Sequence, residues 1–303
     1  MFQYNSSPPF SGRIQEILSS VRRLKPLPTT SQAILKIVEN PEATAQQVID
    51  VIKTDQALAA DVISMANSAA MGYRVTCSSI ETAVVRLGFK RVRSLALKSF
   101  SNGPLSRRLM GYKLEKGVLW EHSLITARYS DLIARIISYP DPEDAYTAGL
   151  LHDMGKLMLD QYILEDYQII LDLTQKKNKH LWEIEEELFG LDHAMIGGLM
   201  AEKWNLPPNL VDGIRFHHMP SLSSAHRKLV AIVNIANALT PAIGDGLTHL
   251  EGRFIGDGVF QILGLNEDSF QVLKRRMFEA IEQEKRMEEI RNGGERAARA
   301  DAG

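Results

Sequence analysis

AGLLHDMGK, residues 148–156, sets a histidine and an aspartate side by side within an apolar run. An aspartate, a proline and two further acidic residues precede it at positions 141–144, a composition typical of a helix start. We therefore expect a helix that begins near Pro142 and carries both His152 and Asp153. Neighbouring helical side chains point about 100° apart, so both can reach a metal ion that lies between them. The alternative is a hydrogen-bonded polar pair in the core, because unpartnered polar groups are costly to bury.

The composition describes an ordinary globular protein. The chain has 303 residues, 45% of them hydrophobic and 24% charged, so about two domains with sizeable cores are expected. A net charge of −2 selects neither nucleic acid nor membrane as a partner. The single cysteine, Cys77, excludes a disulfide framework and suits the cytoplasm. No apolar run is long enough for a transmembrane helix, and MFQYNSSPPF does not resemble a secretory signal.

Apolar residues recur at helical spacing along most of the chain, and no alternating strand pattern of useful length occurs. We therefore expect an all-α fold. In the first third, Thr44, Asp55 and either Ser79 or Thr82 stand where helices are expected to begin. SNGPLS, residues 101–106, predicts a loop that could act as a hinge between two halves.

Two charged segments have no clear chemical role in the sequence. Nine basic residues lie between Arg86 and Lys116 with Glu115 as the only acid among them. No aromatic residues interleave with them to stack on bases, so we expect a solvated face rather than a nucleic-acid surface. Residues 181–189 contain four glutamates, and we expect them to form a solvated helix.

Polar residues with ligand chemistry fall on the expected inner faces of several separate helices. They are His122, His152 with Asp153, His193, the pair His217 and His218, and Asn234. Five of the eight histidines belong to this set, and helix bundles build metal sites from side chains on facing helices. A ligand set of imidazoles and a carboxylate, with no thiolate, suits one or two divalent ions of Fe, Mn, Ni or Zn. A hydrogen-bonded cluster of histidines with water is the alternative.

This order of residues resembles the HD superfamily of metal-dependent phosphohydrolases, and within it the HDOD domain of bacterial signalling proteins. The matching stretches are residues 27–72, 79–97, 119–135, 143–159 and 191–218. The resemblance implies an N-terminal helical lobe followed by an HD-type helical bundle. The expected division is an arm and first helix at 1–23, an HDOD domain at 24–220 with its lobe at 24–110 and its bundle at 111–220, C-terminal helices packing on the bundle at 221–290, and a disordered tail at 291–303.

The resemblance also implies a role for each candidate residue. His122 matches the first metal ligand of the wider family, and His152 and Asp153 match the His-Asp pair that names it. Three residues match the later ligands of the family: His193, His217 and His218. Lys156 matches the basic residue that meets phosphate in catalytic members, so Asp153 and Lys156 are the catalytic candidates. Asn234 is the best counterpart of the family's final aspartate, although a neutral amide is a weaker ligand. The GYP-containing loop of the cyclic di-GMP phosphodiesterase branch is absent.

Two functions follow from the resemblance. The favoured one is a regulatory module that retains a metal site and acts on a signalling protein partner. The other is an active phosphohydrolase for a nucleotide or another phosphoester, in which a metal ion activates water. The kinship implies a nucleotide or phosphate ligand only in the second case, and no membrane or nucleic-acid partner is expected in either.

Overall fold

The computed structural model describes residues 10–68, 71–73, 75–177, 179–240, 254–280 and 282–283. All regular elements in these ranges are helices, and the sole β-bridge among them joins Leu109 to Leu114. The all-α prediction is therefore confirmed, whereas the predicted disordered tail at 291–303 lies outside the described residues. In chain order the helices are α1 (Phe10–Arg22), α2 (Thr29–Glu39), α3 (Ala45–Ile52), α4 (Gln56–Ala66), α5 (Ile80–Leu87), α6 (Phe89–Leu105), α7 (Val118–Ile136), α8 (Pro142–Leu151), α9 (Lys156–Lys177), α10 (Leu181–Phe189), α11 (His193–Lys203), α12 (Pro208–Arg215), the short 3-10 helix η2 (Pro220–Leu222), α13 (Arg227–Leu239) and α14 (Val259–Leu263).

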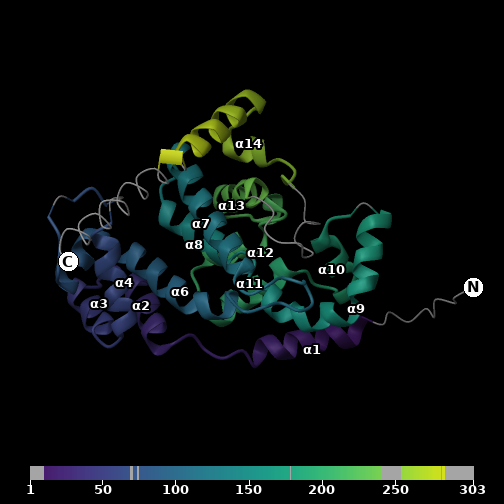
Figure 1. The fold of residues 1–303 in the computed structure, drawn as a ribbon, viewed down its shortest axis with the longest axis horizontal. Helices are drawn as coiled ribbons and strands as arrows, with labels where there is room; N and C mark the ends of the chain where they lie inside the picture. The colour runs from purple at the N-terminus through teal and green to yellow at the C-terminus, as the bar shows by residue number, and fades with distance from the viewer. Residues whose placement is uncertain are drawn as a thin grey trace, which may run out of the picture.

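Helices α2 to α6 form a lobe with its own apolar core (Figure 1). Three of its helices, α3, α4 and α5, begin where the sequence predicts, because a side-chain oxygen caps each of these starts. Thr44 forms a capping box with Gln47, Asp55 accepts from the Leu58 amide, and Ser79 accepts from the Thr82 amide.

The second core belongs to the bundle, where α7, α8, α11, α12 and α13 pack together. Helix α1 packs on α9, α10 and α11 of this bundle, although α2 follows it directly in the chain (Figure 1). At the other end of the chain α14 packs on α13, and a helix over residues 267–280 adds Phe270, Leu273 and Met277 to the same core. None of the described helices combines the length and apolarity that a bilayer crossing requires.

The prediction of a loop at residues 101–106 is wrong, because residues 101–105 are helical. Helix α6 continues through Pro104 and ends at Leu105. Ser101 and Leu105 are both buried on the inner face of this last turn, and Ser101 donates to the Leu97 carbonyl. Burial of these side chains outweighs the local preference of Asn, Gly and Pro for a turn.

The basic stretch is only in part the solvated face that the sequence predicts: Arg107, Arg108, Lys113 and Lys116 are exposed, but another part joins the lobe to the bundle. Along α6, Lys90, Arg91 and Arg93 form ion pairs with Asp141, Glu143 and Asp144 at the start of α8. Ser94 also lies 2.8 Å from Thr147, hydroxyl to hydroxyl. We call this set of contacts the α6–α8 seam. It fixes the helix that leads directly into His152.

Candidate metal centre

His152 and Asp153 lie in a tight turn between α8, which ends at Leu151, and α9, which begins at Lys156. The prediction that a helix carries both residues is therefore wrong. The physical reason is Gly155: a Cβ there would lie 1.9 Å from the His193 carbonyl oxygen and 2.7 Å from the Gly197 amide nitrogen. The turn lets the backbone approach α11 this closely, and it directs both polar side chains inward.

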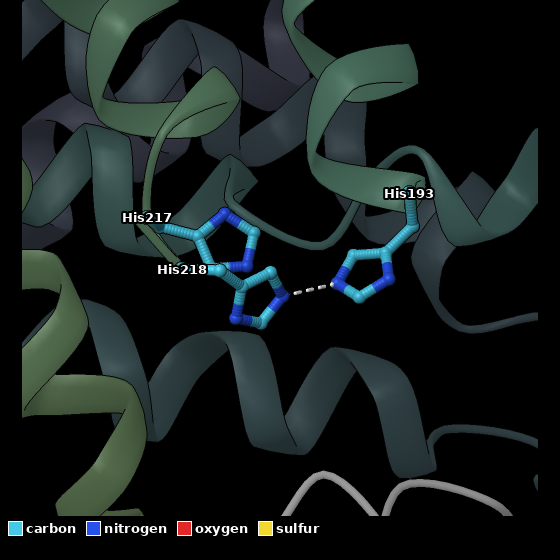
Figure 2. Close-up of side chains that lie close together, drawn as sticks. All are labelled: His193, His217 and His218. Atoms are coloured by element: carbon cyan, nitrogen blue, oxygen red, sulfur yellow. Dashed lines mark hydrogen bonds between the residues drawn. The ribbon is translucent and has the colours of Figure 1, made fainter. Parts of the chain in front are cut away.

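The other histidines approach the same turn from three sides. His122 comes from α7, His193 is the first residue of α11, and His217 and His218 follow α12. In Figure 2, His193 points across at His217 and His218, and His218 Nε2 lies 3.0 Å from His193 Nε2. The imidazoles are almost fully excluded from solvent, with at most 9% exposure, at His122.

The carboxylate of Asp153 stands between two groups of imidazoles. Its Oδ1 lies 3.2 Å from His193 Nε2 and 3.9 Å from His217 Nε2. Its Oδ2 lies 3.4 Å from His152 Nε2, 3.5 Å from His122 Nε2 and 2.6 Å from Lys156 Nζ. The structure therefore brings together six of the seven predicted ligands, together with Lys156.

Unpaired atoms in this cluster fit a metal ion. His217 Nε2 and Asp153 Oδ1 are buried without a hydrogen-bond partner, although a buried polar atom normally has one. The Nδ1 atoms of His152 and His217 lie 2.8 Å from the carbonyl oxygens of Gly149 and Ile214. Both Nε2 atoms therefore face the cluster, where His152 Nε2 lies 3.3 Å from His122 Nε2 and His217 Nε2 has no partner. Two groups have their ligand atoms within 4.8 Å of one another: His193, His217 and His218, and His122, His152 and Asp153.

Burial and neighbouring charges shift the pKa of Asp153 and of each of the five histidines in the cluster. Burial opposes ionisation of Asp153, but His152, Lys156 and His193 outweigh it and hold the pKa of this carboxyl well below its usual range. Burial lowers the pKa of His122 to about 3. It also lowers the pKa of the histidines at 152, 217 and 218. Burial acts the same way on His193, but the charge of Glu185 and the contacts of the ring with the carboxylates of Asp153 and Glu185 raise its pKa to about 10.

We expect the metal-free protein to lose stability when the pH falls from 7 to 5.5. In the folded chain the pKa of His122 lies near 3, below its ordinary value of 6.5, so only the unfolded chain takes up this proton in that window. From pH 7 to pH 5.5, His122 alone then lowers the free energy of unfolding by about 1.3 kcal/mol. The three other histidines with lowered pKa values act in the same direction, and His193, whose pKa is raised, partly opposes them. Urea unfolding at the two pH values measures the effect. A His122→Asn variant should show a shallower dependence, and equal wild-type stability at both values would contradict the prediction.

Asn234 is buried at the site, but its amide is occupied by the backbone. Its Nδ2 donates to the His217 carbonyl at 2.7 Å, and its Oδ1 accepts from the Gly256 amide at 2.9 Å. These bonds give it the role of holding the His217–His218 segment against residue 256. One turn later on α13, the side chain of Asn237 hydrogen-bonds His122, so Asn237 contacts the predicted ligands more directly.

The sequence interpretation missed Glu185. Helix α10 is not solvated on all sides, because Glu185 is fully buried and accepts a hydrogen bond from His193 Nδ1 at 2.6 Å. A signal existed: Leu181, Glu185 and Phe189 are spaced four residues apart, so the glutamate shares a face with two large apolar residues. Trp182 was missed as well, and its ring stacks on His218 with the centroids 5.4 Å apart.

Known proteins are similar to this chain in both sequence and fold. A crystal structure of an HDOD domain protein of unknown function from Geobacter sulfurreducens is 27% identical, with a TM-score of 0.65, over 93% of this chain and 95% of that one. A provisionally assigned phosphohydrolase from Shewanella amazonensis SB2B is 26% identical, with a TM-score of 0.63, over 86% and 92% of the two chains. An uncharacterized protein of Treponema pallidum is 28% identical over 227 residues, 74% of this chain, which spans only 43% of that protein's length.

The family match covers both the lobe and the metal centre. The model of the HDOD domain matches residues 24–220, a range that contains all the candidate ligands except Asn234. The chain belongs to the HDOD domain family.

Proposed function

We propose that this chain is a regulatory HDOD module of bacterial signal transduction that holds one divalent transition-metal ion and acts through a signalling protein partner. The proposal of a bound metal ion rests on the buried carboxylate of Asp153, which faces four imidazoles. Asp153 Oδ1 and His217 Nε2 also lack hydrogen-bond partners. A divalent ion would satisfy both atoms and stabilise the charge of Asp153.

A single ion fits the charges better than two. Lys156 is fully buried, and its ammonium group lies 2.6 Å from Asp153 Oδ2. This positive charge lies beside the group that contains His122 and His152. A second ion bound there would have to share Asp153 Oδ2 with the ammonium group of Lys156. Oδ1 faces the other group, and among the described residues no lysine or arginine forms an ion pair with it. We therefore assign the ion to His193, His217, His218 and Asp153.

The burial of the centre favours regulation over hydrolysis. A substrate phosphate has to approach the ion, yet the described side chains of His152, Asp153, His193 and His217 have no exposed surface. Lys156, the candidate phosphate anchor, is directed at Asp153. A buried ion of this kind stabilises the turn between α8 and α9 against α11 and α12, and so links the bundle's stability to metal supply.

Phosphoester hydrolysis is the second candidate, and one observation favours it. The side chain of His122 is 11% exposed, so the cluster reaches solvent at this histidine. A divalent ion would supply Lewis-acid activation of water there. Lys156 would then leave Asp153 to neutralise a substrate phosphate, and the similarity to a provisionally assigned phosphohydrolase agrees with this chemistry.

Metal analysis tests the proposal. Protein purified without chelator and supplied separately with Fe, Mn, Ni or Zn should retain about one equivalent of at least one of them. An Asp153→Asn variant should retain less than about a tenth of an equivalent, because it loses the charge that the ion balances. Asp61→Asn, on the exposed face of α4, is the matched control and should bind like the wild type.

A parallel assay separates the two candidates. The metal-loaded protein should not hydrolyse bis(p-nitrophenyl) phosphate above the rate of the Asp153→Asn variant. Hydrolysis that the metal supports and the variant lacks would favour the enzyme. A wild-type protein that retains no ion would overturn the metal centre itself.

A further inference from the structure

Glu185 on α10 connects the first residue of α11, His193, with Tyr112, which lies 73 residues before Glu185 in the chain. It is fully buried on α10, and its two carboxylate oxygens have different partners. Oε1 accepts a hydrogen bond from the Tyr112 hydroxyl at 2.8 Å. Oε2 accepts from the His193 backbone amide at 2.8 Å and from His193 Nδ1 at 2.6 Å. Tyr112, which is also fully buried, thus holds the carboxylate from the side opposite the histidine.

These bonds determine how His193 presents its ring. An imidazole has two nitrogens, and a carboxylate accepts only from a protonated one. Because Nδ1 must carry the proton toward Glu185, Nε2 is the nitrogen left for the cluster. That atom lies 3.2 Å from Asp153 Oδ1 and 3.0 Å from His218 Nε2. The bond to Glu185 therefore fixes the ring in the orientation that a metal ligand needs, and a bound metal ion would take the place of a proton on Nε2.

We propose that Glu185, held by Tyr112, is the positioning residue of the metal centre and sets the metal affinity through His193. This inference rests on the proposed metal-binding function. Glu185 does not contact the ion; it acts by keeping Nδ1 protonated and by raising the electron density at Nε2. Carboxylate partners of metal-bound histidines typically change metal affinity by 10- to 100-fold when they are removed.

Tyr112 connects this arrangement to the junction of the two halves of the chain. It lies between Leu109 and Leu114, which form the β-bridge after α6. The amides of Gly111 and Tyr112 lie 2.8 and 3.4 Å from Asp160 Oδ1 on α9. The tyrosine is thereby fixed to α9 as well as to Glu185, so its hydroxyl cannot move away from the carboxylate without moving this segment.

A purely structural role for Glu185 is the competing explanation, because it also accepts from the His193 backbone amide. Glu185→Gln separates the two roles. The glutamine oxygen can still accept from the backbone amide and from Nδ1, while its amide group can donate to the Tyr112 oxygen. The fold and the hydrogen bonds are kept, but the negative charge beside His193 is lost.

The experiment uses Co²⁺ as the probe with the full chain. We expect Glu185→Gln to bind Co²⁺ about 10-fold more weakly than the wild type and to alter the visible absorption spectrum of the bound ion. Nitrogen NMR of the histidine rings should show a changed His193 signal in the metal-free protein. Glu186→Gln, an exposed change at the next position of α10, should leave affinity and spectra unchanged. Tyr112→Phe should weaken binding less, in the same direction, and it provides the test if Glu185→Gln does not fold.

The outcomes distinguish the two proposals. If the wild type takes up no Co²⁺ or any other ion, the proposed metal centre fails, and this inference fails with it. If the wild type binds Co²⁺ and folded Glu185→Gln binds it equally, with an unchanged His193 signal, only the positioning role is overturned.

Discussion

An alanine at position 155 is expected to lower the free energy of unfolding by about 3 kcal/mol and to remove the metal-binding capacity. The added Cβ would lie 1.9 Å from the His193 carbonyl oxygen and 2.8 Å from the His193 carbonyl carbon. These are backbone atoms at the start of α11, so no flexible side chain can move aside. Relief requires the turn that carries Asp153 to separate from α11, and this movement takes Asp153 away from His193.

Urea unfolding and metal analysis of Gly155→Ala measure both effects. Gly103→Ala is the matched control: a Cβ at Gly103, within α6, meets nothing within 4 Å. Alanine there should be neutral or stabilise the protein by up to about 1 kcal/mol, because glycine is a poor helix former. Equal stability of Gly155→Ala and the wild type would show that α11 can shift freely, contrary to the packing of this turn.

Gly155 also explains why the sequence does not predict the break between α8 and α9. Apolar periodicity and capping residues predict the all-α fold and several helix starts, because both signals are local. The break between α8 and α9 is not local, since it depends on how closely Gly155 approaches α11. The pattern around His152 is equally compatible with one continuous helix, and only the packing of α11 shows that a turn is required.

The clustering of the candidate ligands could be predicted because it depends on a different kind of signal. Their order along the chain is a sequence property, and the resemblance to the HD superfamily assigned six residues that the structure brings together. Asn234 was assigned by position alone, and position does not reveal that both ends of its amide bind the backbone. Glu185 was hidden by its acidic neighbours, because charge composition alone gave no reason to separate it from them.

The basic stretch between Arg86 and Lys116 shows a third limit of prediction from the sequence. Lys90, Arg91 and Arg93 have acidic partners about fifty residues later in the chain. A sequence pattern read over one or two helical turns cannot detect such a pairing. The first part of this run of positive charge is thus explained by a contact between two helices.

Within the α6–α8 seam, Arg93→Met is expected to lower the free energy of unfolding by about 3 kcal/mol. Arg93 and Asp144 form an ion pair in which the side chains are only 5% and 7% exposed. Removal of the guanidinium leaves the carboxylate buried with Asn209, 2.6 Å away, and a more distant lysine. Arg108→Met is the control, because Arg108 and Glu115 are 56% and 70% exposed, and loss of such a pair costs at most about 1 kcal/mol.

Metal analysis of Arg93→Met shows whether the seam also controls the metal centre. Asp144 lies in the first turn of α8 and His152 follows its last residue, so the two are separated by about two helical turns. The end near His152 has its own anchor: a Cβ at Gly149 would lie 2.6 Å from Ser130 Oγ and 2.9 Å from the Thr126 carbonyl oxygen. Because α7 holds this end of α8 so closely, folded Arg93→Met should retain the full metal content of the wild type. A reduced metal content in the folded variant would instead mean that α8 moves as a rigid rod and transmits changes in the lobe to Asp153.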